Sequence, residues 1–285
     1  MSKYKYNKDY FEKINTQEKA YWLGFLYADG CINALYKNGN LRSMNLELTL
    51  AEVDKVHIEK FAKAIDTNVP IKQKVAKYQG KQYMAYRIII CSTKMCKDLC
   101  DLGCFTNKTY YLRLPNESIV PNLYMKDFLR GYFDGDGCVR KRLDQTGYTL
   151  TFTGMEMMLK DIRNYLTSNL IINVMPKIHK DKRSKASSLY IYGNDNVKDF
   201  LNYLYNNASI YLDRKYQVYK QCLENVKGRY GVYFDKYINK YIATISINNN
   251  RIRIGSYNNE EDAIVARKNA EVKKMMLNAD LISNN

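Results

Sequence analysis

Histidine is scarce in this 285-residue sequence, which contains only His57 and His179. A histidine-based catalytic triad or a histidine-rich metal site is therefore not expected, and both residues are interpreted as surface or core positions. None of the seven cysteines forms a Cys-x-x-Cys pair, and Cys96, Cys100 and Cys104 recur at every fourth position of a predicted helix. This spacing argues against a zinc site, and we expect reduced, mostly buried thiols.

Long apolar runs are also missing, because no stretch approaches the length that spans a bilayer. The first residues contain no apolar segment of the kind found in secretory signals. Together with the odd number of cysteines, these features predict a soluble intracellular protein, in the cytoplasm or in an organelle matrix that holds its target.

Acidic residues are the minority among the charged side chains, with 29 Asp and Glu against 45 Lys and Arg and a formal net charge of +16. The basic residues are spread along the chain rather than collected in one tail. This balance favours a polyanionic partner, and nucleic acid is the leading candidate. From charge alone, the alternatives are a merely basic protein and one attracted to anionic membranes.

Two similar stretches, residues 22–30 and 129–137, each end in Asp-Gly. Within each stretch, small residues stand four positions apart, so that two helices can pack closely along a flat stripe. The small residues are Gly24, Ala28, Gly131 and Gly135.

The aspartates that end the two stretches are Asp29 and Asp136, and both are expected at one end of the helix pair. The glycine after each aspartate is expected to end its helix in a left-handed conformation. Because each carboxylate would lie at the negative end of a helix dipole and near the other carboxylate, a divalent cation would stabilise the arrangement.

The predicted elements occur twice in the same order, namely helix, two strands, helix, two strands and helix. The offset is 107 residues, the difference between 136 and 29, and it also relates Cys31 to Cys138. The second repeat is predicted to open with a helix from about residue 127. We therefore predict a lead-in at 1–16, a first repeat at 17–114, and a linker with the second repeat at 115–225.

A third pattern follows residue 227, with short predicted strands near 231–233, 241–247 and 251–257. Asn258 or Asn259 is expected to cap the helix that follows. We predict a small C-terminal module of three strands and one helix at 228–285.

The paired stretches and the duplicated elements resemble the LAGLIDADG homing endonucleases in their single-chain, two-repeat form, over roughly residues 17–225. The resemblance implies an α+β fold of two pseudo-symmetric αββαββα repeats, whose saddle-shaped antiparallel sheets lie in the DNA major groove. It also implies that Asp29 and Asp136 are catalytic and bind metal, because the last acid of each motif does so in the family. Mg²⁺ is the implied ion, with Mn²⁺ as a substitute.

Two lysines separated by the same offset, Lys108 and Lys215, follow the predicted last helix of each repeat. They resemble the basic residue that the family places near the scissile phosphate, where it can orient water or stabilise the transition state. Asp134 is left outside the metal set, because its partner position in the first repeat is Tyr27.

Side chains at alternate strand positions are implied to contact DNA, with phosphate contacts outnumbering base contacts. In the two repeats these are Asn33, Tyr36, Lys37, Arg42, Asn45, Lys72, Lys74, Arg87, Arg140, Arg142, Gln145, Lys177, Lys182 and Arg183.

The C-terminal module resembles the DNA-binding domain of plant ethylene-response factors of the APETALA type. The matching residues include Gly231-Val232, Ile254-Gly255 and Glu260-Glu261. The resemblance implies DNA contacts from a three-stranded sheet, and a small packing domain is the alternative. The candidate contacts are Tyr233, Lys236, Lys240, Arg251 and Arg253.

These features predict a monomeric, site-specific endonuclease that cuts both strands of a long asymmetric DNA target in intron homing. One alternative is an RNA maturase on the same fold, with intron RNA as its partner. The other is a DNA-binding regulator that does not cleave, which the retained pair of acids argues against.

Overall fold

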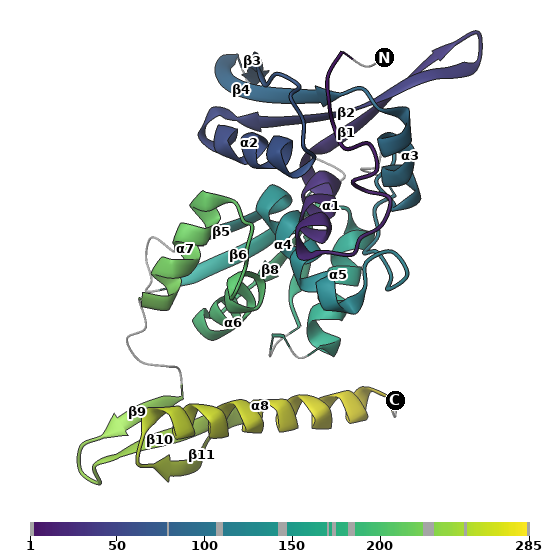
Figure 1. Ribbon diagram of the computed structural model, residues 1–285. Helices are drawn as coiled ribbons and strands as arrows, with labels where there is room; N and C mark the ends of the chain where they lie inside the picture. The colour runs from purple at the N-terminus through teal and green to yellow at the C-terminus, as the bar shows by residue number, and fades with distance from the viewer. Residues whose placement is uncertain are drawn as a thin grey trace.

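The computed structural model describes residues 3–78, 80–106, 111–141, 147–169, 171–172, 175–181, 186–224, 231–247 and 250–283. Its elements follow the order predicted from the sequence, and the α+β class with antiparallel sheets is confirmed. The first half contains α1 (Gln17–Asp29), β1 (Gly30–Lys37), β2 (Asn40–Ala51), a 3₁₀ turn η1 (Glu52–Asp54), α2 (Lys55–Ala64), β3 (Lys72–Tyr78), β4 (Lys81–Ile90) and α3 (Thr93–Asp101) (Figure 1).

The second half repeats this order and adds one helix, α7, which the sequence analysis did not predict. Its elements are α4 (Asn122–Asp136), β5 (Gly137–Lys141), β6 (Tyr148–Gly154), α5 (Glu156–Ser168), β7 (Lys177–Lys180), β8 (Ser187–Ile191), α6 (Asn194–Tyr205) and α7 (Asp213–Glu224). Each half has a four-stranded antiparallel sheet, with the order β1-β2-β4-β3 in the first and β5-β6-β8-β7 in the second. One hydrophobic core runs through both halves.

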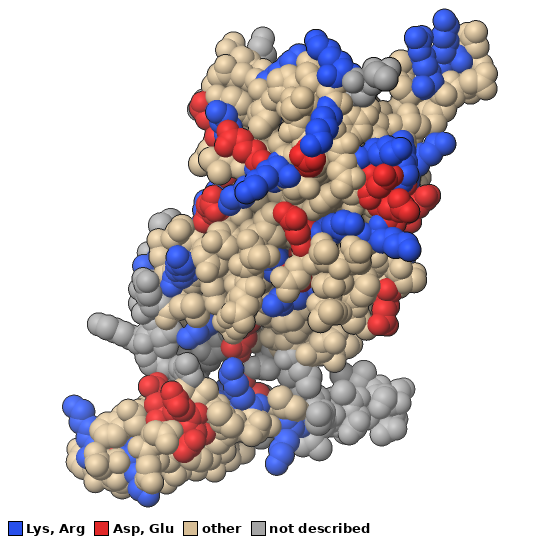
Figure 2. Space-filling model, in the orientation of Figure 1, with Lys and Arg blue, Asp and Glu red and all other residues tan. Residues whose placement is uncertain are grey.

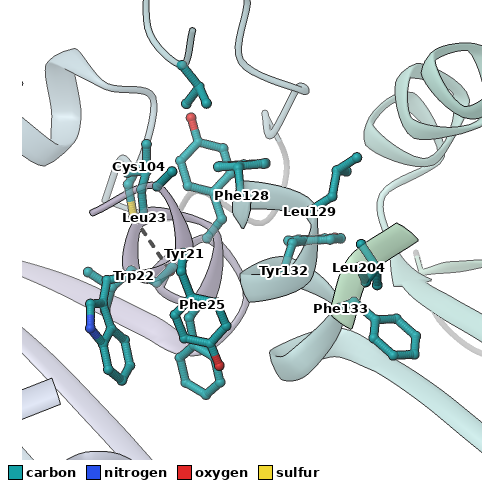
Figure 3. Packing of buried hydrophobic residues seen from close by; sticks show 14 of the residues in the cluster. Tyr21, Trp22, Leu23, Phe25, Cys104, Phe128, Leu129, Tyr132, Phe133 and Leu204 are labelled. Carbon is teal, nitrogen blue, oxygen red and sulfur yellow. Dashed lines mark hydrogen bonds between the residues drawn. The ribbon is translucent and has the colours of Figure 1, made fainter. Parts of the chain in front are cut away.

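The helices α1 and α4 touch through their backbones. A Cβ on Gly24 would overlap the carbonyl oxygen of Phe128, and a Cβ on Gly131 would overlap the carbonyl oxygen of Tyr21. Nearer the C-terminal ends, a Cβ on Gly135 would overlap the methyl group of Ala28. The small residues therefore let the backbones meet, while aromatic side chains from the two helices fill the space around the contact (Figure 3).

The glycines after the motif aspartates do not adopt the left-handed conformation that we predicted. Gly30 has φ −71° and ψ 142°, and Gly137 has φ −87° and ψ 157°, so each continues directly into a strand as extended backbone. A side chain is excluded by close approach instead, because a Cβ on Gly30 would collide with Leu26 and one on Gly137 with Phe133. Each motif helix thus passes into its sheet without a loop.

Two helices differ in detail from their predicted forms. The helix α4 begins at Asn122, directly after Pro121, rather than near residue 127. The second helix of the first half is divided into η1 and α2, and its buried face includes Ile58 and Phe61, whereas Val53 and Val56 are 74% and 53% exposed.

The N-terminal lead-in is part of the core of the first half. Tyr10, Phe11 and Ile14 are buried, and the backbone N–H of Asn7 donates to the carbonyl of Ile65 at 2.8 Å. The Tyr6 hydroxyl donates to the carbonyl of Cys91 at 2.7 Å. These contacts attach the segment to α2 and to the end of β4.

The hairpin β1–β2 extends away from the rest of the first half (Figure 1). It turns at Asn38 and Gly39, which have φ 52° and 78°, as a two-residue hairpin of this type requires. The pairing register skips Arg42, which is therefore the extra residue of a bulge. Figure 2 shows basic side chains gathered at the end of this hairpin.

The C-terminal module has the predicted three strands and one helix. They are β9 (Val232–Asp235), β10 (Lys240–Ile247), β11 (Asn250–Tyr257) and α8 (Glu260–Ser283), with strand order β11-β10-β9. Its small core joins Val232 and Ala243 of the sheet to Ala263 of the helix. Asn259 caps the helix, since its side-chain oxygen accepts from the N–H of Asp262 at 2.8 Å.

The cysteines are all free thiols, and three of the seven are buried, so the expectation of mostly buried thiols was wrong. In the described parts of the chain, none of the helices combines the length and the apolar character that crossing a membrane requires.

The variant Gly131→Ala tests the backbone contact. The new methyl group would collide with the Tyr21 carbonyl, which is backbone and cannot rotate away, so α1 and α4 must separate. We expect the free energy of unfolding, measured in urea, to fall by about 1–3 kcal/mol or more. Leu123→Ala, at a 77% exposed position of the same helix, is the control and should change it by under about 0.5 kcal/mol. An equal effect of both variants would contradict the interpretation.

Candidate active site and nucleic-acid interface

Asp29 and Asp136 are the last residues of α1 and α4, at the same end of the packed helix pair. A Cβ on Gly135 would lie 3.0 Å from an Asp29 carboxylate oxygen, so the Asp29 side chain lies against the last turn of α4. The next residue after each acid begins a strand, β1 after Asp29 and β5 after Asp136. The acids therefore stand where both sheets begin.

This acidic pair fits a hard divalent cation in the chemistry of its donors. Carboxylate oxygens are the ligands that Mg²⁺ prefers, and Mg²⁺ is usually held by one or two carboxylates together with water and substrate phosphate. Among the described residues, no group of three or more His, Cys, Asp or Glu side chains is arranged to hold a metal. The described residues therefore supply two carboxylates for such an ion, those of Asp29 and Asp136.

Lys215 follows α6, the predicted last helix of its repeat, and lies in the first turn of the added helix α7. It is buried, and its ammonium donates to three carbonyls, those of Phe133 at 2.5 Å, Asp134 at 2.8 Å and Gly137 at 2.5 Å. These carbonyls belong to the C-terminal end of α4, so Lys215 caps the helix that carries Asp136. Burial lowers the pKa of Lys215 to about 8.

Asp134 is a buried hydrogen-bond acceptor rather than a member of the partly exposed acidic pair. Its carboxylate accepts from the Tyr21 hydroxyl at 2.7 Å, the Tyr205 hydroxyl at 2.5 Å and the backbone N–H of Leu212 at 2.8 Å. Burial raises the pKa of Asp134, and the charge of Lys215 opposes that rise. Asp134 thereby connects α4 to α1, to the end of α6 and to the segment before α7.

The equivalent position of the first half, Tyr27, makes a comparable connection with a different group. Its hydroxyl donates at 2.5 Å to the carbonyl of Leu102, just beyond α3. The same position in both halves therefore joins the motif helix to the third helix of its own half. The break in symmetry between Tyr27 and Asp134 was visible in the sequence, whereas the tyrosines that bind Asp134 carried no local signal.

His57 is a core residue, which is one of the two roles expected for it. Its Nε2 lies 2.9 Å from the Tyr21 hydroxyl, and since that hydroxyl donates to Asp134, the histidine must be the donor. Burial lowers the pKa of His57 to about 3, and the positive charges of Lys60 and Arg214 act in the same direction. His57, Tyr21 and Asp134 thus form a hydrogen-bonded chain from α2 through α1 to α4.

The first sheet has one face on the core and another, which we call the outer face, pointing away from it. Core-facing positions of β2 alternate with outer positions, and cross-strand partners share a face. Asn33 and Asn45 are such partners, joined by a side-chain hydrogen bond of 3.3 Å. The polar members of the outer face include Cys31, Asn33, Asn45, Glu47, Thr49, Lys72, Lys74 and Arg87. The predicted DNA contacts within these strands lie on this outer face. The exceptions are at the end of the β1–β2 hairpin, where Tyr36 and Lys37 are exposed.

The second sheet has an outer face of different chemistry. Arg140 and Lys177, both predicted contacts, lie on it with hydroxyl-bearing and aromatic side chains, and Tyr190 stacks on Tyr192. Its members are Cys138, Arg140, Thr149, Thr151, Thr153, Lys177, His179, Ser188 and Tyr190. The predicted residues Lys108, Arg142, Gln145, Lys182 and Arg183 fall outside the described residues.

In the C-terminal module, most of the predicted contacts share the sheet face opposite α8. Tyr233, Lys240, Arg251 and Arg253 belong to this face by their strand register. The Arg251 guanidinium lies 5.4 Å from the Tyr233 ring centroid and donates to the Thr244 hydroxyl at 3.1 Å. Lys236 is exposed in the turn after β9.

Comparison with known proteins gives a family match and a fold match. Residues 124–205 match the family model described as a LAGLIDADG-like domain. The homing endonuclease I-WcaI, solved bound to its DNA recognition sequence, superposes with a TM-score of 0.51 at 18% identity over 74% of this chain and 91% of that chain. This similarity, with the element order above, shows that the chain has the α+β fold of LAGLIDADG meganucleases.

Two further solved structures are similar to the chain. The meganuclease I-SmaMI bound to uncleaveable DNA is 15% identical, with a TM-score of 0.46 and coverage of 72% of this chain and 89% of that chain. The LAGLIDADG homing endonuclease I-GzeII in complex with a DNA target is 11% identical, with a TM-score of 0.47 over 72% and 88%. No curated protein matches the chain.

His57 makes stability depend on pH. Because its pKa is about 3 in the folded chain and about 6.5 when unfolded, the unfolded chain binds an extra proton between these values, and stability falls as pH falls. From pH 7 to pH 5 the wild type should lose about 2 kcal/mol of unfolding free energy through this group. The variant His57→Leu should lose less, while His179→Leu, at an exposed position, should retain the wild-type slope.

The variant Lys215→Met tests the cap on α4. It would leave three buried carbonyls without the ammonium and remove the counter-charge of Asp134. We expect the free energy of unfolding to fall by roughly 3 kcal/mol. Lys220→Met, at an exposed position of the same helix, is the control. A stability equal to that of the control would show that the buried bonds contribute nothing.

Proposed function

We propose that the chain is a LAGLIDADG homing endonuclease that makes a double-strand break at a long, asymmetric DNA site by metal-dependent phosphodiester hydrolysis. The observation that carries the proposal is the placement of Asp29 and Asp136 together at the point where both sheets begin. The match of residues 124–205 to the family model and the fold shared with a DNA-bound endonuclease support it.

In the proposed mechanism, Asp29 and Asp136 would hold a divalent cation, which we propose is Mg²⁺. When bound, Mg²⁺ would neutralise charge on the phosphoryl oxygens and supply an activated water. The chain's own part is to fix the two carboxylates. Gly135 lets Asp29 approach α4, and the bonds from Lys215 to carbonyls on both sides of Asp136 hold that end of the helix. The negative ends of both helix dipoles favour a cation at the same place.

The outer faces of the two sheets are the proposed DNA-binding surfaces. Basic side chains lie on both, and the hairpin end adds Lys37 and Arg42. Such contacts release counterions from DNA, so we expect affinity to fall steeply with salt concentration. Because the first face carries the amides of Asn33 and Asn45, whereas the second carries the rings of His179 and Tyr190, the two half-sites should differ in sequence.

The C-terminal module is proposed as an additional DNA-binding unit of the APETALA-like type. The support for this role is the shared face of Tyr233, Lys240, Arg251 and Arg253, which combines positive charge with an aromatic ring and lies opposite the helix.

Asp29→Asn and Asp136→Asn should separate binding from cleavage. Each change removes a carboxylate charge from the pair while keeping its size, so we expect Mg²⁺-dependent cleavage of a target selected from a randomised DNA library to fall by at least about 100-fold. Binding of the same DNA should stay within a few-fold. Asp66→Asn, which removes a charge at a 68% exposed side chain, is the control and should cut normally. Wild-type cutting by both variants of the pair would overturn the proposal.

A further inference from the structure

One acidic residue interrupts the outer face of the first sheet. Glu47, in the middle of β2, is the only Asp or Glu in the sequences of β1, β2, β3 and β4. Its cross-strand partners are Cys31 of β1 and Ile89 of β4, and it is close to the side chains of Lys74 and Arg87. A carboxylate on a surface that approaches DNA phosphates is repelled by them, so its presence there requires an explanation.

The two oxygens of this carboxylate have different surroundings. Oε1 accepts from the Thr49 hydroxyl at 2.9 Å and from the Lys74 ammonium at 3.3 Å, and it lies 3.8 Å from a terminal nitrogen of Arg87. No hydrogen bond from the described residues reaches Oε2. Because the Glu47 side chain is 20% exposed, this second oxygen is the one left for a group from outside the chain.

The surrounding groups keep the carboxylate ionised and its direction fixed. Burial acts to raise the pKa of Glu47, but the hydrogen bonds from Thr49 and Lys74 outweigh it and hold that pKa below its ordinary value. An ionised carboxylate accepts hydrogen bonds and donates none. Three contacts on one oxygen also restrict the rotation of the group, so Glu47 presents a fixed acceptor with two cations beside it.

We propose that Glu47 determines specificity in the first half-site, with Oε2 accepting a hydrogen bond from the N4 amino group of a cytosine in the major groove. The inference rests on the proposed function, because it requires the outer face to meet DNA. It assigns one base pair of the target to a residue outside the predicted contacts.

Cytosine is the base that fits an acceptor in this position. Its major-groove edge offers the N4 amino donor, whereas guanine presents the acceptors O6 and N7 and thymine presents O4 with a methyl group. Adenine has an N6 donor beside the acceptor N7, which suits an amide that both donates and accepts better than a carboxylate.

The neighbouring cations suit the guanine of the same base pair. Arginine and lysine donate to guanine O6 and N7, the acceptors that lie beside cytosine N4 in a C·G pair. Arg87 retains donor capacity, since no hydrogen bond within the described part of the chain occupies its terminal guanidinium nitrogens and its side chain is 35% exposed. Arg87 on β4 and Lys74 on β3 lie on the same side of Glu47 in the strand order. Glu47 and these cations therefore form a row of one acceptor followed by donors, which is the complement of the N4, O6 and N7 groups of a C·G pair.

The test compares base preferences of the wild type and Glu47→Gln. Double-stranded DNA carrying a site selected by the wild type, randomised one position at a time, is bound without divalent metal so that cleavage does not interfere. We expect the wild type to prefer C·G at one position in the first half-site by roughly 10-fold. In Glu47→Gln this preference should be lost or shift to A·T, because glutamine pairs with adenine N6 and N7, while all other positions keep their preferences.

Glu59→Gln is the matched control, because it removes the same charge from an exposed ion pair with Lys55 on α2. It should leave every base preference unchanged, and thermal unfolding should establish that both variants are folded. If Glu47→Gln binds all sequences more tightly with no change at any position, Glu47 only balances charge and the inference is wrong. A wild type without any sequence preference would instead overturn the proposed function, and this inference with it.

Discussion

The two halves of the molecule are joined by direct contact between the backbones of α1 and α4. At Gly24 and Gly131 no side chain intervenes, and a single added carbon on either would overlap a carbonyl oxygen of the other helix. Close-packed backbones have few alternative arrangements, because neither can deform without breaking its own hydrogen bonds. The contact between the helices therefore sets the positions of Asp29 and Asp136 and of the strands that follow them, although the two carboxylates repel each other.

Polar groups buried beside this contact fix the relative orientation of the helices through directional hydrogen bonds. His57, Tyr21, Asp134 and Tyr205 form hydrogen bonds that pass from α2 through α1 and α4 to α6. Burying an ionisable carboxylate is unfavourable unless its oxygens are satisfied, and three donors meet that requirement at Asp134. The arrangement is costly to disturb, since loss of the Tyr205 hydroxyl would leave the buried Oδ1 of Asp134 without its donor, and loss of the Tyr21 hydroxyl would leave Oδ2 with one donor in place of two.

The sequence was sufficient to predict the elements and their duplication, because a small-residue stripe and alternating strands follow from local patterns. It also led to the helix pair and to the acids at its end, since Gly24 and Gly131 repeat at a constant offset. It failed where a residue's role depends on distant backbone. Nothing in the sequence indicated that Lys215 caps α4, because the carbonyls that it binds lie about 80 positions away in the chain. Glu47 was passed over because nothing local distinguishes an outer-face acid from a solvated one.

The hydrogen bond from Tyr21 to Asp134 has a consequence for how two copies of the chain can combine. The position equivalent to Tyr21 in the second half is Phe128, which has no hydroxyl. If two second halves paired with each other, each Asp134 would face a phenyl ring where it now meets a donor. If two first halves paired, Tyr21 of one molecule would meet Tyr27 of the other, where it now meets Asp134. Pairing of like halves from two molecules is therefore penalised, so each first half is favoured to pack against a second half.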